Sequence, residues 1–558
     1  MTITNMKNII RILQVLAVVV TLNGCTKDYL DINKDPNSPT VPELNKLLPG
    51  SELYMVEALG QGDFIGDNLS SYVHQLVSRE VQNYGMGTQA NNPYNTWNYL
   101  YTYVLKDLDA IIEHAEPEGN LIYAGIAKTL KAYTFSVMVD LWGDIPFSEF
   151  NVEELLAPKP DTSKDIYNAL IDMLESGKAD LENTEAENLL RPGSDDFFYG
   201  GDKGKWVKLN NTITLKLLLQ SRKAKSDITE WQGKFNALVS ANNFISAGED
   251  FQFWYKKETT PRDMRHPAIS NYSGQTTHFI SPYFFETMNG DTYNTIDNPF
   301  ANIEDPRIPY YFVNQLKSGQ ASESPHEYRN GNFMSIFFAS NGPNSAGSND
   351  KSLTKLGIYL NGGKYDDGKG GVVSVLDSYG EAPHKLITFS SLKFMLAELA
   401  LAGETTGDAR TLLKEGVEAS TAHVNLVASK QPNVPQISNS IRDAFVNQIL
   451  TRYDAADTNG KMRIVMTQKW IANIFNPVES YNDHRRTGFP TFFDPAKTQD
   501  PGNGVNPVEA ERSPKKVPLT NIASFPRSLY YPTSSETELN PNMTQKTNLS
   551  TPFVFWDK

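Results

Sequence analysis

The sequence predicts a mostly α-helical chain: a tetratricopeptide-like helical scaffold with a large loop-rich, aromatic insertion and few short strands. Three observations lead to this prediction. Apolar residues recur at steps of three and four in several long segments, as on the buried side of a helix. Between about residues 248 and 383 that pattern stops, and aromatic residues alternate with Gly, Asn, Ser and Pro. Finally, the 558 residues include one cysteine, so no internal disulfide holds the chain together.

The first half of the chain contains four helical patterns. The second of them stops at Gly143, with Pro146 beyond it, which is a favourable way to end a helix. Successive helix pairs of about 34 residues are typical of a tetratricopeptide solenoid, although the repeat signature matches poorly beyond Trp97 and Leu100. The predicted helices are Tyr94–His114, Leu121–Trp142, Ile166–Leu181 preceded by Ser163, and Trp206–Lys225.

Helical patterns resume after the insertion, and the last segment is rich in proline. The predicted helices are Leu386–Ala402, Ala409–His423, Ile441–Tyr453 and Lys461–Phe475. The last segment, Thr487–Lys558, is expected to wrap over the helices of the protein. We therefore divide the chain into a signal peptide (1–24), an extended tether (25–42), an N-terminal helical region (43–247), the insertion (248–383), and a C-terminal helical region with its tail (384–558). Residues 25–558 are expected to form one unit.

The N-terminus has the features of a lipoprotein signal. Two basic residues precede Ile12–Leu22, an apolar run of eleven residues that is too short to cross a membrane as a helix. The run ends in Leu-Asn-Gly-Cys, which resembles a bacterial lipobox, so we expect cleavage before Cys25 and lipidation of its thiol, with palmitate among the acyl chains. The alternative is an ordinary secretory signal with a chance cysteine. Thr26–Asp28 resembles the signal that sends lipoproteins to the outer face of the outer membrane.

The composition argues against nucleic-acid binding and gives no support for catalysis. The formal net charge is −14, and an acidic surface repels phosphate backbones. Histidines do not fall in a helical zinc spacing, no nucleophile elbow is present, and no glycine-rich phosphate loop occurs. Asp454–Gly460 fails as a calcium loop because its first and twelfth ligands would be Ala455 and Met466, so we read it as a turn. We expect no catalytic residue, no metal and no cofactor.

Aromatic side chains are the candidates for ligand contact. Their faces cover the apolar faces of sugar rings, and they also accept peptide side chains. The competing interpretation is that each ring belongs to the core or to its hydrogen-bonded shell. The candidates are Tyr84, Tyr94, Trp97, Trp254, Tyr283 and Tyr293, and those in turn-rich sequence are preferred.

Several stretches, in order along the chain, resemble the SusD/RagB family of nutrient-binding outer-membrane lipoproteins of Bacteroidetes. They include the mature N-terminus after the lipobox, Asp140–Glu149 (DLWGDIPFSE), Phe394–Gly403, Tyr481–Pro490 and Phe525–Pro532. The resemblance implies a tetratricopeptide-like fold and a non-enzymatic role as the lid of a SusC-like TonB-dependent transporter. It also implies that a lipid anchor holds the protein to the outer membrane, facing the cell exterior.

The resemblance leaves the ligand open. An oligosaccharide is our leading hypothesis, and an oligopeptide in the same role is the alternative. Two hypotheses from other functional classes remain: that the protein is a surface hydrolase, or that it is a helical adaptor with no small ligand.

Overall fold

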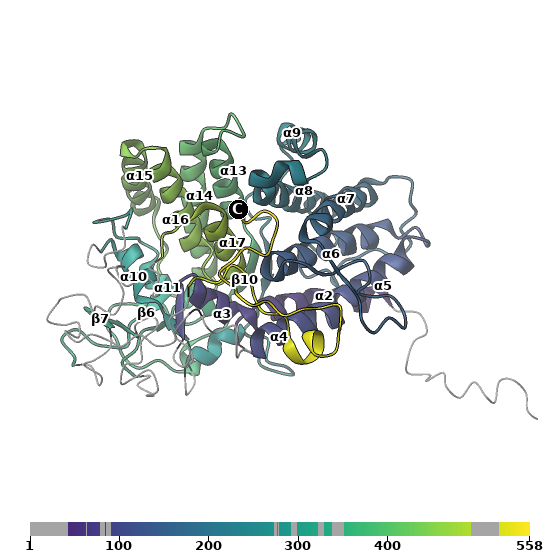
Figure 1. Ribbon diagram of the computed structural model, residues 1–558. Helices are drawn as coiled ribbons and strands as arrows, with labels where there is room; N and C mark the ends of the chain where they lie inside the picture. Colours follow the sequence, from purple (N-terminus) through teal and green to yellow (C-terminus); the bar gives the residue numbers. More distant parts are fainter. Residues whose placement is uncertain are drawn as a thin grey trace, which may run out of the picture.

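The computed structural model is a helical protein with two groups of helices and a loop-rich region beside one of them (Figure 1). The prediction of a mostly helical chain with few short strands is confirmed. Cys25 and Tyr293 lie outside the described residues, as do the predicted signal peptide and tether. The structure describes residues 43–62, 64–78, 84, 91–272, 276, 278–291, 298–321, 328–336, 351–492 and 524–558.

The first group of helices surrounds α6, whose sequence is apolar on nearly every side and which is buried along most of its length. Two glycines let α6 and α7 approach closely, because a Cβ on Gly125 would lie 2.7 Å from the carbonyl oxygen of Gly177. The group comprises α2 (Leu44–Leu59), α3 (Ile65–Tyr72), α4 (Asn91–Tyr99), the π-helix η3 (Leu100–Leu105), α5 (Lys106–Ala115), α6 (Leu121–Trp142), α7 (Ser163–Glu182), α8 (Lys203–Gln220), the 3-10 helix η4 (Ser221–Asp227) and α9 (Trp231–Ala241).

The loop-rich region contains short helices and two-stranded antiparallel pairs. Its aromatic residues form a packed core; the rings of Phe285 and Phe333, for example, stack with centroids 3.9 Å apart. The short helices are η5 (Pro267–Tyr272), α10 (Pro282–Asn289), α11 (Ile308–Tyr311), α12 (Ile358–Asn361) and η6 (Val375–Asp377). The pairs here are β4 (Phe251–Trp254) with β10 (Pro383–Ile387), β6 (Phe312–Val313) with β9 (Lys355–Leu356), and β7 (Tyr328–Asn330) with β8 (Phe333–Ser335).

Two more strand pairs connect other parts of the chain. They are β1 (Leu76–Ser78) with β5 (His278–Ile280), and β2 (Ile145–Pro146) with β3 (Pro160–Asp161). The first pair joins the N-terminal helices to the loop-rich region. The second closes the loop that follows α6.

The second group of helices follows β10. Leu386 and Ile387 were expected to begin a helix, but they belong to β10, where Ile387 lies opposite Phe251. The helix begins only after Thr388, whose side chain accepts a hydrogen bond from the backbone of Ser391. The group comprises α13 (Phe389–Leu401), α14 (Ala409–Ala428), α15 (Asn439–Ala455), α16 (Thr458–Ala472) and α17 (Pro477–Thr487).

The C-terminal tail, residues 524–558, crosses from α17 to α6 and carries a π-helical turn, η7 (Thr533–Thr537); it is the yellow segment in Figure 1. The indole of Trp556 donates to Asp140 Oδ1 over 3.0 Å, and the buried ammonium of Lys546 donates to the carbonyl oxygen of Trp142 over 2.7 Å. These contacts fix the tail to α6. Across the described ranges, no helix is long and apolar enough to cross a membrane.

Candidate functional site

The best candidate for a binding surface is the outer side of one long helix. Elements α4, η3 and α5 run on without a break from Asn91 to Ala115, because the residues at both junctions keep helical backbone angles. Tyr94, Asn98 and Thr102 follow each other at four-residue steps and lie on the solvent side, where Tyr94 is 38% exposed. The Thr102 hydroxyl donates to Asn98 Oδ1 over 3.3 Å.

Three tyrosines form a cluster beside this row. The rings of Tyr54 on α2 and Tyr103 on η3 stack at 5.0 Å, and Tyr99 meets them edge-on at 5.8 and 5.2 Å. Tyr103 is 40% exposed, and Tyr54 and Tyr99 are half-buried. Burial, with a further contribution from the carboxylate of Glu57, raises the pKa of Tyr99, so its hydroxyl remains a hydrogen-bond donor at neutral pH. We call Tyr54, Tyr94, Asn98, Thr102 and Tyr103, together with Tyr99, the tyrosine face.

Trp97 lies on the same helix but faces the interior. Its ring packs against Trp142 at 5.2 Å and Tyr531 at 6.0 Å, and its indole donates to Glu536 Oε1 over 3.0 Å. The side chain is almost fully buried. Trp97 therefore supports the tyrosine face and ties η7 to it.

Three other candidates from the sequence, Tyr84, Tyr283 and Trp254, have other surroundings. Tyr84 is buried, with its hydroxyl 2.6 Å from His74 Nε2, and Tyr283 is buried, donating to the carbonyl oxygen of Thr491 over 2.7 Å. Trp254 on β4 is half-buried, with the ammonium of Lys430 4.9 Å from its ring centre. The role of these residues in ligand binding stays a prediction.

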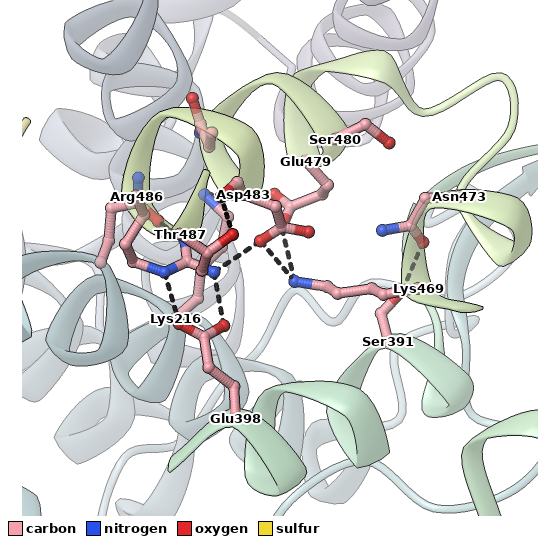
Figure 2. A network of polar contacts seen from close by, with 12 residues as sticks. Lys216, Ser391, Glu398, Lys469, Asn473, Glu479, Ser480, Asp483, Arg486 and Thr487 are labelled. Carbon is pink, nitrogen blue, oxygen red and sulfur yellow. Dashed lines mark hydrogen bonds and ion pairs between the residues drawn. The ribbon is translucent and has the colours of Figure 1, made fainter. Parts of the chain in front are cut away.

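Figure 2 shows a polar cluster in the interior, an ion-pair network where the two groups of helices meet. Arg486 on α17 donates to Glu398 on α13 over 2.8 and 2.6 Å and to Asp483 over 2.6 Å. Lys469 on α16 donates to Asp483 over 2.8 Å. From the N-terminal group, Lys216 on α8 lies 3.3 Å from Glu479.

This network is a structural element rather than a binding site, because its charged side chains are at most 6% exposed and neutralise one another. Burial alone would raise the pKa of Glu398, but the charges of Arg486 and Arg222 hold it at about 2. The carboxylate is therefore ionised throughout the physiological range. It links α13 to α17 and to η4, the 3-10 helix that follows α8.

The described part of the chain offers no arrangement for metal-dependent chemistry, since no three His, Cys, Asp or Glu residues in it come close enough to hold a metal ion. Its buried histidines are held neutral by burial, which lowers the pKa of His74 to about 3 and of His484 to about 4. The hydroxyl of Tyr84 lies against the first ring and the carbonyl oxygen of Pro490 against the second, 2.9 Å from His484 Nδ1. These contacts are packing contacts of the interior.

With this geometry in view, comparison with known proteins identifies the family. A SusD-like family model, described as starch-binding and associating with the outer membrane, matches residues 36–510. The chain belongs to this family. SusD-like proteins are carbohydrate-binding and non-catalytic, so the chain is not an enzyme. No curated protein matches it.

Solved structures share the fold of this SusD-like chain at low sequence identity. A chitin-binding protein is 20% identical, with a TM-score of 0.65 over 92% of this chain and 100% of its own. A chitin-binding SusD homologue from Flavobacterium johnsoniae is 18% identical, with a TM-score of 0.63 over 92% and 98%. A SusD/RagB family protein from Bacteroides thetaiotaomicron is 22% identical, with a TM-score of 0.63 over 92% and 99%.

Of the residues of the tyrosine face, the sequence analysis names Tyr94 alone as a candidate. Tyr54 lies in a helix that the apolar pattern does not predict. Tyr99 and Tyr103 lie in a predicted helix, but the apolar stripe of that helix favours Trp97 as the candidate. One signal was available: Tyr99 and Tyr103 are four residues apart, as are Tyr94 and Asn98, and this spacing places each pair on one side of a helix.

Proposed function

We propose that this SusD-like protein captures an oligosaccharide on the tyrosine face and, as a lid, delivers it to a SusC-like TonB-dependent transporter. The observation that carries the proposal is the combination of exposed tyrosine rings with the amide of Asn98 and the hydroxyl of Thr102 on one rigid helix. Rings cover the apolar faces of sugars, while amides and hydroxyls bind their hydroxyl groups. The rings also lie together, so several sugar units of one chain could be held at once.

The chemistry of the face favours a sugar over a peptide. Its members are tyrosine, asparagine and threonine, with no acidic or basic side chain among them, whereas a site for peptide termini or charged side chains requires fixed charges. The starch-binding description of the family and the two chitin-binding relatives support the same ligand class. An oligopeptide in the same role remains the alternative, and binding of peptides in preference to sugars would favour it.

The test is calorimetric titration of the purified chain with malto- and chito-oligosaccharides, and with mixed peptides for comparison. Replacing Tyr103 by alanine removes about 60 Å² of apolar contact, worth about 1.5 kcal/mol, so we expect affinity to fall about tenfold. Tyr379→Ala is the matched control, because Tyr379 has the same 40% exposure as Tyr103 but lies in the loop after η6. Equal affinity in both variants would contradict the site.

The place of the protein in the cell is also part of the proposal. We propose that Cys25 is lipidated and anchors the chain to the outer membrane, facing the exterior, where an oligosaccharide first meets the cell. Tagged protein purified from native outer membranes in mild detergent should bring a large TonB-dependent barrel with it. Release of sugar products when the protein is incubated with an oligosaccharide would instead support the hypothesis of a surface hydrolase. Capture of the transporter without any ligand affinity would support the hypothesis of a helical adaptor.

A further inference from the structure

Two segments far apart in sequence lie against each other at the edge of the tyrosine face. One is the loop 147–159 between β2 and β3, and the other is 533–542 in the tail. The side-chain amides of Asn540 and Asn542 donate to the carbonyl oxygens of Pro158 and Ala157, each over 2.8 Å. The two segments thus form one continuous surface.

This surface exposes aliphatic side chains to an unusual degree. Leu156 is 94% exposed, Leu539 74%, Val152 51% and Leu155 40%. Single exposed leucines are common on proteins, but four aliphatic residues on two joined segments are typical of an interaction site. We call Val152, Leu155, Leu156 and Leu539 the apolar patch.

The backbone beneath the patch is held in place. Asp161 accepts hydrogen bonds from the backbone of Phe147 and Ser148 over 3.0 and 2.7 Å, and Glu149 accepts one from the backbone of Lys159 over 2.8 Å. Because the loop is already ordered, a partner that covers the leucines gains their burial without paying to order the chain. These hydrogen bonds therefore hold the side chains of the loop in place at the surface.

The patch is connected to the tyrosine face through the interior. Tyr101 donates to the carbonyl oxygen of Pro146 over 2.6 Å at the start of the loop, and Trp97 donates to Glu536 in the tail segment over 3.0 Å. A partner seated on the patch would consequently lie beside a sugar bound on the tyrosine face. This is the arrangement that transfer of the sugar to that partner requires.

The charges around the apolar patch indicate what kind of partner it binds. Glu153, Glu154 and Glu538 flank the leucines and are exposed, and the two segments carry one exposed cation, Lys159. We call the three glutamates the acidic rim. An anionic lipid surface would be repelled by this rim, and so would a second copy of this acidic chain. The rim fits a protein with an apolar socket bordered by lysine or arginine.

We propose that the apolar patch is the docking surface for the transporter, whose socket accepts Leu156 and Leu539 inside a basic rim. This inference rests on the proposed function, since it takes the transporter as the partner. It assigns the contact to residues outside the tyrosine face. Docking and sugar binding are therefore separable by mutation.

The experiment compares two variants of the full-length, lipidated chain, purified with a tag from native outer membranes in mild detergent. In the first, Leu156→Glu and Leu539→Glu are combined. In the second, the control, Leu376→Glu changes a leucine of η6 that is 96% exposed. We expect the double variant to recover at least tenfold less transporter than wild type, with unchanged sugar affinity and thermal midpoint, and the control to recover the wild-type amount.

A third variant tests the acidic rim. Combining Glu153→Lys with Glu154→Lys should also reduce recovery of the transporter, because it places like charges against the basic border. Full recovery in the leucine variant would overturn the docking surface and leave the proposed function standing. If wild type recovers no transporter, or recovers only a second copy of this chain, both proposals fall. Loss of sugar affinity in the leucine variant would show that the two surfaces are not separate and would also overturn the inference.

Discussion

Glu398 lies at the joint between the two helical groups, and Glu398→Gln measures how much its ion pairs stabilise the fold. Its carboxylate accepts two hydrogen bonds from Arg486, and one of its oxygens also lies 3.1 Å from Arg222 on η4. The shift of its pKa from 4.5 to about 2 corresponds to about 3 kcal/mol in favour of the charged form. Breaking one side of a buried ion pair costs about 3–5 kcal/mol. Because Arg486 keeps its ion pair with Asp483 at 2.6 Å, we expect Glu398→Gln to lower the free energy of unfolding by about 3 kcal/mol.

The measurement is the midpoint of thermal unfolding, followed by circular dichroism on matched samples. An unfolding entropy of about 2 cal/mol/K per residue gives about 1 kcal/mol/K for a chain of this size, so the midpoint should fall by about 3 °C. Glu418→Gln is the control, because that carboxylate is partly exposed and 3.8 Å from Lys414, and its midpoint should hardly change. An equal, small change in both variants would refute the view that the network holds the two groups together.

Three further predictions follow from individual contacts. Burial holds the pKa of five histidines near 3 or 4: His74, His266, His384, His423 and His484. Below pH 6.5 the unfolded chain therefore binds protons that the folded chain cannot, and the free energy of unfolding should fall from pH 6.5 towards pH 4, by about 2 kcal/mol per histidine at pH 5. Denaturant titrations measure this, and a flat profile would contradict it. Gly143→Ala should destabilise the fold by several kcal/mol, since φ is +77° and a Cβ would lie 2.3 Å from the carbonyl oxygen of Phe553. The control is Gly119→Ala, which has the strain of φ +70° without the clash and should cost about 1 kcal/mol in the same assay. Cys25→Ser should leave the chain unlipidated and absent from the outer-membrane fraction, and unchanged retention there would disprove the anchor.

The sequence predicted helices well where apolar periodicity forms them. The predicted Leu121–Trp142 has the bounds of α6, because its apolar character is continuous and Gly143 ends it with a positive φ. Helix α17 was missed for the opposite reason. Its sequence is polar, and it is buried by ion pairs of Asp483 and Arg486 with other helices, which no pattern within the segment reveals.

The site was harder to predict because exposure depends on neighbours distant in sequence. Tyr94 and Trp97 are three residues apart on one helix, yet the first faces solvent and the second is covered by Trp142 and the tail. The turn-rich sequence around Tyr84 predicts an accessible ring, but that ring is buried against His74. Aromatic residues identify candidates, and the packing of α2 and the tail decides which of them reach the surface.

The contacts that hold the fold together are separate from the tyrosine face. The contacts that join its parts, such as Arg486 with Glu398 and Trp556 with Asp140, lie in the interior and have no access to a ligand. The exposed groups of the tyrosine face make few contacts that the fold depends on, so Tyr94 and Asn98 can change at little cost to stability. Solved structures about 20% identical share this fold, so the proposed ligand depends on the outer side of this helix rather than on contacts in the interior.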